Sequence, residues 1–151
     1  MFAGTPSHAL AHLWEALGDR KAQRVLSPGE MLFSSSAPAN AVYLVEQGRV
    51  KLVLTPPLKS GKPFEVVGPG AVLGLSEVMS GSRYNLSAEA TEEVHTSFVQ
   101  RGVLLDFLAD HQEYRVHIVR VLSEDLHSLY LRFRSMTPEP RPRKNPRAPS
   151  A

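Results

Sequence analysis

The sequence predicts a single, mainly β domain with flanking helices, and three patterns carry this prediction. Residues 25–100 hold short β-branched and aromatic runs separated by Pro, Gly, Ser and Asn, as in a small sandwich or barrel. One helical pattern precedes these runs, and two follow them. With 151 residues, of which 42% are hydrophobic, the chain is long enough for one compact domain with a core.

The N-terminal stretch "TPSHALAHLWEALG" predicts a short helix. Thr5 or Ser7 can cap its start, and Gly18 suits its end. Four apolar residues share one face at helical spacing and are expected in the core: Leu10, Leu13, Trp14 and Leu17.

The β region contains two expected turns. The run "VYLVEQGRVKLVL" is typical of a β-hairpin that turns at residues 46–49, around Gly48. A second turn is expected at Ser60 and Gly61.

The last third of the chain is predicted to be helical. After the short helix pattern "RGVLLDFLADHQ", residues 113–136 contain no Pro or Gly and predict one long helix. Five apolar residues recur along it at the spacing of a coiled-coil seam, which predicts a homodimer interface: Val119, Leu122, Leu126, Leu129 and Phe133. Tyr114, Ile118 and Val121 lie on a neighbouring face and are expected to pack on the domain itself.

Charge is concentrated in the final segment. Residues 137–151 carry four basic groups against one acidic group and are rich in Pro, so we expect a disordered tail after a domain at residues 1–136. Such a tail is too short to fold into a DNA-reading element, and no sequence-specific DNA binding is predicted. Non-specific contact of the tail with an acidic partner or with nucleic acid stays open. Neither a signal peptide nor a membrane-spanning run is present, so a cytoplasmic location is expected, with no membrane partner.

The stretch "GAVLGLSEVMSGSRYNLSAEA", residues 70–90, is the candidate binding site. Its Gly and Ser positions allow backbone N–H groups to approach a ligand, and Arg83 can pair with a phosphate. The alternative is a simple turn between strands.

Three motifs together resemble the sensor domain of the catabolite activator/fumarate-nitrate regulator family, the cyclic-nucleotide-binding domain. "PGEMLF" is similar to the family's opening strand motif, and "AVYLVEQGRVKLVL" is similar to its signature hairpin. "VGPGAVLGLSEVMSG…SAEATEEVHTSFV" is similar to its phosphate-binding cassette with the flanking strands. The resemblance implies a double-stranded β-helix, a jelly-roll-like β-roll, between a short N-terminal helix and a long C-terminal dimerisation helix.

The resemblance also implies a mechanism and a site. Cassette amides, a glutamate and an arginine bind a cyclic nucleotide, and ligand binding shifts the long helix. Carried over to this chain, the ligand-binding cassette residues are Gly74, Leu75, Ser76, Glu77, Arg83 and Tyr84.

Two departures bear on the ligand. The family's cyclic AMP binders carry a Gly-Glu pair where this chain has Gly74-Leu75, and leucine cannot accept a bond from a ribose hydroxyl. Arg83 is followed by Tyr84 and Asn85 rather than by two small residues. A cyclic nucleotide is therefore a possible ligand, and cyclic AMP is disfavoured.

The sequence predicts a dimeric small-ligand sensor that acts in signalling or transcription through a protein partner. The alternative is a ligand-free dimerisation or adaptor module with a degenerate cassette. No enzyme is expected, because "GLSEV" lacks the closing glycine of a nucleophile elbow and "KSGK" lacks the glycines of a phosphate loop. No metal site is expected either, since His8, His12 and Glu15 fit a solvated helix face.

Overall fold

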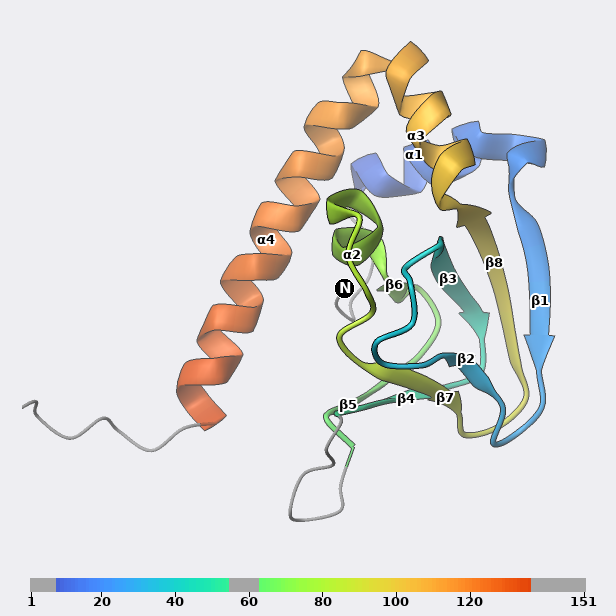
Figure 1. Cartoon of the computed structure of the whole chain (residues 1–151), viewed down its shortest axis with the longest axis vertical. Coiled ribbons are helices and arrows are strands. Elements are labelled where there is room, and N and C mark those ends of the chain that lie inside the picture. The colour runs from blue at the N-terminus through green and yellow to red at the C-terminus, as the bar shows by residue number, and fades with distance from the viewer. Residues whose placement is uncertain (1–7, 55–62, 137–151) are drawn as a thin grey trace, which may run out of the picture.

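The computed structural model describes residues 8–54 and 63–136, although several side chains near the end of the last helix lie outside the description. The expected tail at residues 137–151 and the expected turn at Ser60 and Gly61 fall outside the described residues. Helices and strands follow the predicted order, with a helix first, strands in the middle and helices last (Figure 1), except that the expected glycine turn in the strand region contains a short helix at Leu75–Ser80.

In the part of the chain that the structure describes, eight strands form two four-stranded antiparallel sheets, so the predicted β-roll is confirmed. The first sheet has the order β1-β8-β3-β6 and the second has the order β2-β7-β4-β5. Their bounds are β1 Ala22–Leu26, β2 Met31–Phe33, β3 Ala41–Gln47, β4 Val50–Val53, β5 Glu65–Val67, β6 Val72–Leu73, β7 Ser87–Ala90 and β8 Val94–Gln100.

The predicted hairpin at residues 46–49 is wrong. Its two strands form, but β3 pairs with β6 and β8 in the first sheet, whereas β4 pairs with β5 and β7 in the second. The chain turns a corner between the sheets at Gly48, alongside the corner between β7 and β8, where the Thr91 amide donates to the Arg49 carbonyl at 3.0 Å. A local sequence pattern marks the turn but does not say which partner each strand will take.

The interior of the roll and the outer face of the first sheet are both apolar. Helix α1, His8–Leu17, covers the outer face of this sheet, and its predicted core residues Leu10, Leu13, Trp14 and Leu17 are all buried. Because side chains alternate along a strand, Leu44 faces α1 while the neighbouring Tyr43 faces the interior. The two faces of β3 thus pack in two different compartments, the roll interior and the space under α1.

The C-terminal helices extend from the end of β8. Helix α3, Arg101–Asp110, buries Leu104, Phe107 and Leu108. The long helix expected at residues 113–136 forms α4, Gln112–Met136, which contacts α1 and then runs along one side of the roll (Figure 1). Within the described residues, no helix has the length and apolar character needed to cross a bilayer.

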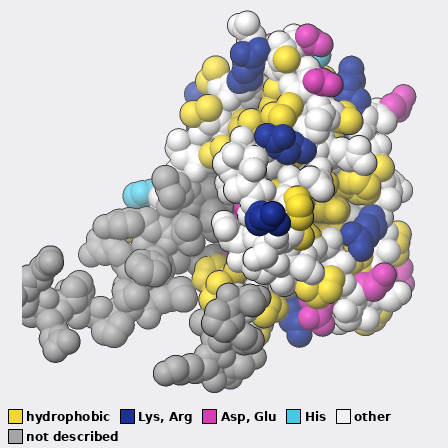
Figure 2. All heavy atoms as spheres, in the orientation of Figure 1, with side chains coloured by type: hydrophobic (Ala, Val, Ile, Leu, Met, Phe, Trp, Pro, Cys, Tyr) yellow, Lys and Arg dark blue, Asp and Glu magenta, His cyan; other side chains and the backbone are white. Residues whose placement is uncertain are grey.

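Charged side chains are dispersed over the face of the molecule drawn in Figure 2. Lys and Arg side chains stand singly among apolar and neutral atoms, and acidic side chains lie towards the edge of the same face. The described residues on this face therefore form no continuous basic stripe of the kind that holds a nucleic-acid backbone.

Candidate functional site

The candidate cassette is built around the short helix α2, Leu75–Ser80, between β6 and β7. Gly74 precedes the helix with a φ of 89°, and Gly81 follows it with a φ of 72°. Both values lie in the left-handed region that favours glycine. A Cβ atom on Gly74 would stand 3.0 Å from the Tyr84 ring and 3.2 Å from the Ala41 carbonyl oxygen. The start of α2 is therefore packed tightly against side chain and backbone of the same domain.

Leu75 belongs to the hydrophobic core, where only 2% of its surface is exposed. It occupies the position at which the resemblance leads one to expect a carboxylate. Ser76, the next residue, is half-buried, and its hydroxyl donates to the Glu77 carboxylate at 3.1 Å. Neither the Leu75 nor the Ser76 side chain supplies a carboxylate that could accept a hydrogen bond from a sugar hydroxyl.

Glu77 points into the protein, with 2% of its surface exposed. Its carboxylate accepts hydrogen bonds from the Ser76 hydroxyl and from the Asn85 side-chain amide, the latter at 3.2 Å. Its backbone carbonyl accepts from the Ser80 hydroxyl at 3.2 Å and from the Ser82 amide at 3.0 Å. Glu77 thus ties α2 to the loop that follows it, which is a positioning role.

Arg83 lies on the surface, and its Nη1 atom donates to the Ser36 carbonyl at 2.7 Å. This is the one hydrogen bond of its guanidinium within the described part of the chain. Neither Glu77 nor Glu89 pairs with Arg83, because Glu77 bonds Asn85 and Glu89 lies 3.8 Å from the Lys51 ammonium. Since a guanidinium has five N–H donors, Arg83 keeps most of its capacity for an anion.

Tyr84 points the opposite way from Arg83 and is 5% exposed. Its ring stacks on Phe33 with centroids 3.9 Å apart. Its hydroxyl donates to the Ala41 carbonyl at 2.6 Å and accepts from the Ala41 amide at 3.3 Å. Burial raises the pKa of Tyr84 to about 12, so the phenol stays neutral in any physiological buffer. Tyr84 is a core residue that closes the space beside Gly74.

The structure therefore places the six predicted cassette residues differently. Four of them, Gly74, Leu75, Glu77 and Tyr84, are packed inside the domain, whereas Ser76 is half-buried and Arg83 is exposed. Sequence reasoning did not single out Phe33, Ala41 and Asn85, which hold Tyr84 and Glu77 in place. Phe33 lies in the quoted "PGEMLF" motif, but the motif alone does not indicate a stacking partner 51 residues away.

Arg101 is a further residue that the sequence did not single out. Its Nε donates to the Val78 carbonyl at 2.9 Å and so satisfies the end of α2. It also borders a surface pocket of about 540 Å³ with Asn40, Tyr43 and Phe98. This pocket adjoins the roll interior from the side of β3 and β8.

The predicted seam on α4 is only partly within the described side chains. Val119 is 63% exposed, and Leu122 packs partly against the core. The side chains of Leu126, Leu129 and Phe133 lie outside the description. The neighbouring face follows the prediction, because Ile118 and Val121 are buried and Tyr114 packs against the core. Among the described residues no cluster of acidic or His side chains could hold a metal ion.

Comparison with protein families gives a match over residues 23–111 to the family described as "Cyclic nucleotide-binding domain". Among curated proteins, the chain is 26% identical over 127 residues to a CRP-like cAMP-activated global transcriptional regulator of Mycobacterium tuberculosis. This match covers 83% of the chain and 54% of the relative. The chain thus spans about half the length of the curated relatives it matches.

Solved structures share the same fold at low sequence identity. A cyclic nucleotide-binding domain from Methylobacillus flagellatus is 19% identical, with a TM-score of 0.70 over 93% of this chain and 79% of that one. The catabolite activator protein of Thermus thermophilus is 20% identical, with a TM-score of 0.69 over 86% and 61%. The sensor domain of the regulator DNR from Pseudomonas aeruginosa is 24% identical, with a TM-score of 0.64 over 82% and 87%.

Proposed function

The chain belongs to the cyclic nucleotide-binding domain family, related to CRP-like regulators, and from this premise we propose that it is a small-ligand sensor without enzymatic activity. Its ligand carries a phosphate or a similar anion and binds at the cassette. The sensor acts through α4 on a protein partner in signalling or transcription. The family match supports this proposal because it covers the whole roll together with the cassette.

The observation that carries the proposal is the state of Arg83. Its guanidinium is exposed and makes a single hydrogen bond, to Ser36, within the described residues. A planar guanidinium with free N–H groups pairs with phosphate through charge-assisted hydrogen bonds. An anion can therefore reach Arg83 without displacing a buried ion pair.

Cyclic AMP is a poor ligand in this proposal. The family's cyclic AMP binders use a glutamate where this chain has Leu75, which is buried in the core. Glu77 is not a substitute, because its carboxylate is buried and bonded to Ser76 and Asn85. Loss of one hydrogen bond to a charged group weakens binding by roughly tenfold or more.

A thermal-shift screen with cyclic mono- and dinucleotides tests this function. At least one anionic ligand should raise the melting temperature of the wild type and leave Arg83→Ala unchanged. Arg49→Ala is the matched control, because Arg49 is also an exposed arginine at a strand corner but lies outside the cassette. If no compound shifts the wild type, the sensor proposal fails.

The second candidate function is a ligand-free dimerisation or adaptor module, and Tyr84 favours it. The Tyr84 ring fills the space beside Gly74 and stacks on Phe33, so part of the cassette is occupied by the protein itself. This candidate predicts a negative result in the screen together with a stable dimer.

Homodimerisation through α4 belongs to both candidates. Val116 and Val119 are 59% and 63% exposed, which leaves apolar surface on α4 for a second copy. Val119→Asp should give monomers in light scattering and should not unfold the domain, because the side chain contacts solvent in the single chain. Val25→Asp is the control, since Val25 on β1 is 56% exposed but lies away from α4. A wild type that is monomeric at high micromolar concentration would exclude the seam.

A further inference from the structure

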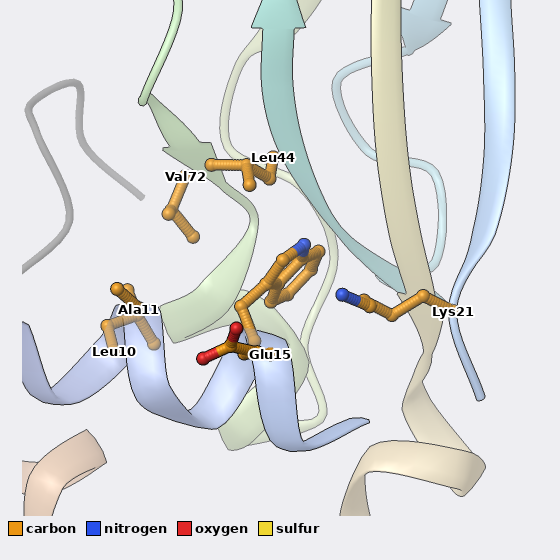
Figure 3. Close-up of a pocket in the computed structure, with 7 residues that line it drawn as sticks. Leu10, Ala11, Glu15, Lys21, Leu44 and Val72 are labelled. Carbon is orange, nitrogen blue, oxygen red and sulfur yellow. The ribbon is translucent and has the colours of Figure 1, made fainter. Parts of the chain in front are cut away.

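A pocket of about 380 Å³ lies between α1 and the outer face of the first sheet (Figure 3). Leu10 and Trp14 of α1 form one side, and Leu44 of β3 with Val72 of β6 forms the other. Leu44 faces away from the roll interior, whereas Tyr43 beside it faces Phe33. The pocket therefore lies on the outer face of the first sheet, whereas the Tyr43, Phe33 and Tyr84 rings pack together on its inner face. Its volume is in the range of small-molecule sites.

The pocket has a rigid aromatic wall. The Trp14 indole nitrogen donates to the Ser97 hydroxyl at 2.8 Å, and this buried bond fixes the ring against the sheet. A fixed indole gives a flat apolar surface at little cost in side-chain entropy. The aliphatic side chains of Leu10, Leu44 and Val72 complete a lining that suits a hydrocarbon or aromatic body.

Two charged residues stand at this pocket without pairing to each other. Lys21, just before β1, is half-buried, and its ammonium lies 5.9 Å from the centre of the Trp14 ring. Glu15 is exposed on α1, and Figure 3 shows its carboxylate and the Lys21 ammonium on different sides of the pocket. Within the described part of the chain neither residue forms a salt bridge, whereas Lys51 and Glu89 do.

We propose that this pocket is a second ligand site, which binds a small monocarboxylate with an apolar body. The carboxylate pairs with the Lys21 ammonium, and the body lies against Trp14, Leu44 and Val72. A half-buried ammonium group attracts an anionic partner more strongly than a fully solvated ammonium group does. Exposed Glu15 at the rim disfavours a second negative charge on the ligand. The site goes beyond the cassette function and does not depend on it.

Trp14 is the sole tryptophan of the chain, so its fluorescence reports on this pocket directly. The probe is 4-bromophenylacetate, whose bromine quenches a neighbouring indole. The wild type should show saturable quenching, and Lys21→Met should weaken binding roughly tenfold, because it removes one charge-assisted bond and keeps the apolar stem. Lys51→Met is the control, since Lys51 lies on β4 in the other sheet and should leave the affinity unchanged.

A second pair of variants tests the location without changing charge. Ala11→Met fills the pocket from α1 and should abolish saturable quenching. Ala16→Met, also exposed on α1 but outside the pocket lining, should have no effect. Glu15→Gln should leave affinity for the probe equal or higher, whereas a clear loss would assign the pocket to a zwitterion and overturn the proposal.

Three other outcomes would overturn it. The first is the absence of saturable quenching of the wild type at millimolar probe. The second is full affinity in Lys21→Met. The third is a shift of Trp14 emission that depends on protein concentration without the probe, which would assign the pocket to a second copy of the chain.

Discussion

Gly48 and Gly74 have almost the same backbone conformation, with φ values of 86° and 89°, but the space beside each is filled differently. A Cβ atom on Gly48 would overlap the Glu93 carbonyl oxygen, which belongs to the backbone of the neighbouring corner. A Cβ atom on Gly74 would meet the ring of Tyr84 at 3.0 Å. The space beside Gly48 is limited by main-chain atoms, and the space beside Gly74 is limited mainly by a side chain.

This difference distinguishes a corner of the roll that is bounded by main chain from a cassette whose interior is bounded mainly by one side chain. The corner at Gly48 joins the two sheets, and any residue larger than glycine must move backbone there. The cassette at Gly74 keeps its turn, but the size of its interior depends on the side chain at position 84. The side chain at position 84 therefore decides how much space is left beside Gly74.

Gly48→Ala should have the largest effect on stability. It adds the strain of a left-handed backbone to a clash with a carbonyl group that has little room to move, so we expect a loss of about 3 kcal/mol or more. Chemical denaturation measures this loss. Gly29→Ala is the reference, because Gly29 has a φ of 88° with nothing within 4 Å of the added atom. Equal losses in the two variants would show that the crowded corner adds nothing to the backbone strain.

Gly74→Ala should cost less than Gly48→Ala and more than Gly29→Ala. The strain of about 1–2 kcal/mol is the same, but the added Cβ would meet the Tyr84 ring at 3.0 Å and the Ala41 carbonyl oxygen at 3.2 Å, contacts that a shift of a few tenths of an ångström relieves, whereas the overlap at Gly48 is much deeper. The same denaturation experiment gives the order of the three variants. A loss in Gly74→Ala as large as that in Gly48→Ala would mean that the Tyr84 ring and the Ala41 carbonyl cannot give way to the added atom.

Tyr84→Phe should cost roughly 1–2 kcal/mol at neutral pH, since it removes the hydrogen bond to the Ala41 carbonyl and keeps the stacked ring. The difference from the wild type should shrink at alkaline pH. The folded pKa of about 12 lies above the value of about 10 for an unfolded tyrosine, so the neutral phenol stabilises the fold below pH 10. That contribution is lost as pH rises from about 10 to 12. A gap between the two proteins that stays constant over this interval would contradict the burial of the phenol.

Much of the fold follows from periodicity, because burial repeats every 3.6 residues in a helix and every two in a strand. The core face of α1 and the buried face of α4 were predictable in this way, as Leu13 and Ile118 illustrate. The placement of β3 and β4 in different sheets was not predictable, because the local pattern of a tight turn is the same whether the two strands pair or separate into two sheets. Contacts far apart in sequence decide that question, here those of β3 with β8.

The cassette shows the same limit. Its position and its glycines could be recognised from residues 70–90, and the buried Leu75 agrees with the missing carboxylate. The direction of each side chain could not be predicted from these residues. Glu77 turns inward and bonds Asn85, whereas Arg83 turns outward and bonds Ser36. These directions depend on the strand-like pairing of residues 82–84 with residues 36–39, a contact between segments about 46 residues apart.

Calorimetric titration of the wild type and Arg83→Ala with cyclic AMP tests the central claim, that the cassette binds anions through Arg83 and lacks the ribose-binding carboxylate. Arg83 is exposed and makes one hydrogen bond, to the Ser36 carbonyl, so its removal should change stability by no more than about 1 kcal/mol, and binding lost from the folded variant then belongs to the site. We expect weak or undetectable binding to the wild type and none to Arg83→Ala. Tight, stoichiometric binding of cyclic AMP that survives Arg83→Ala would contradict the claim and place the ligand elsewhere in the domain.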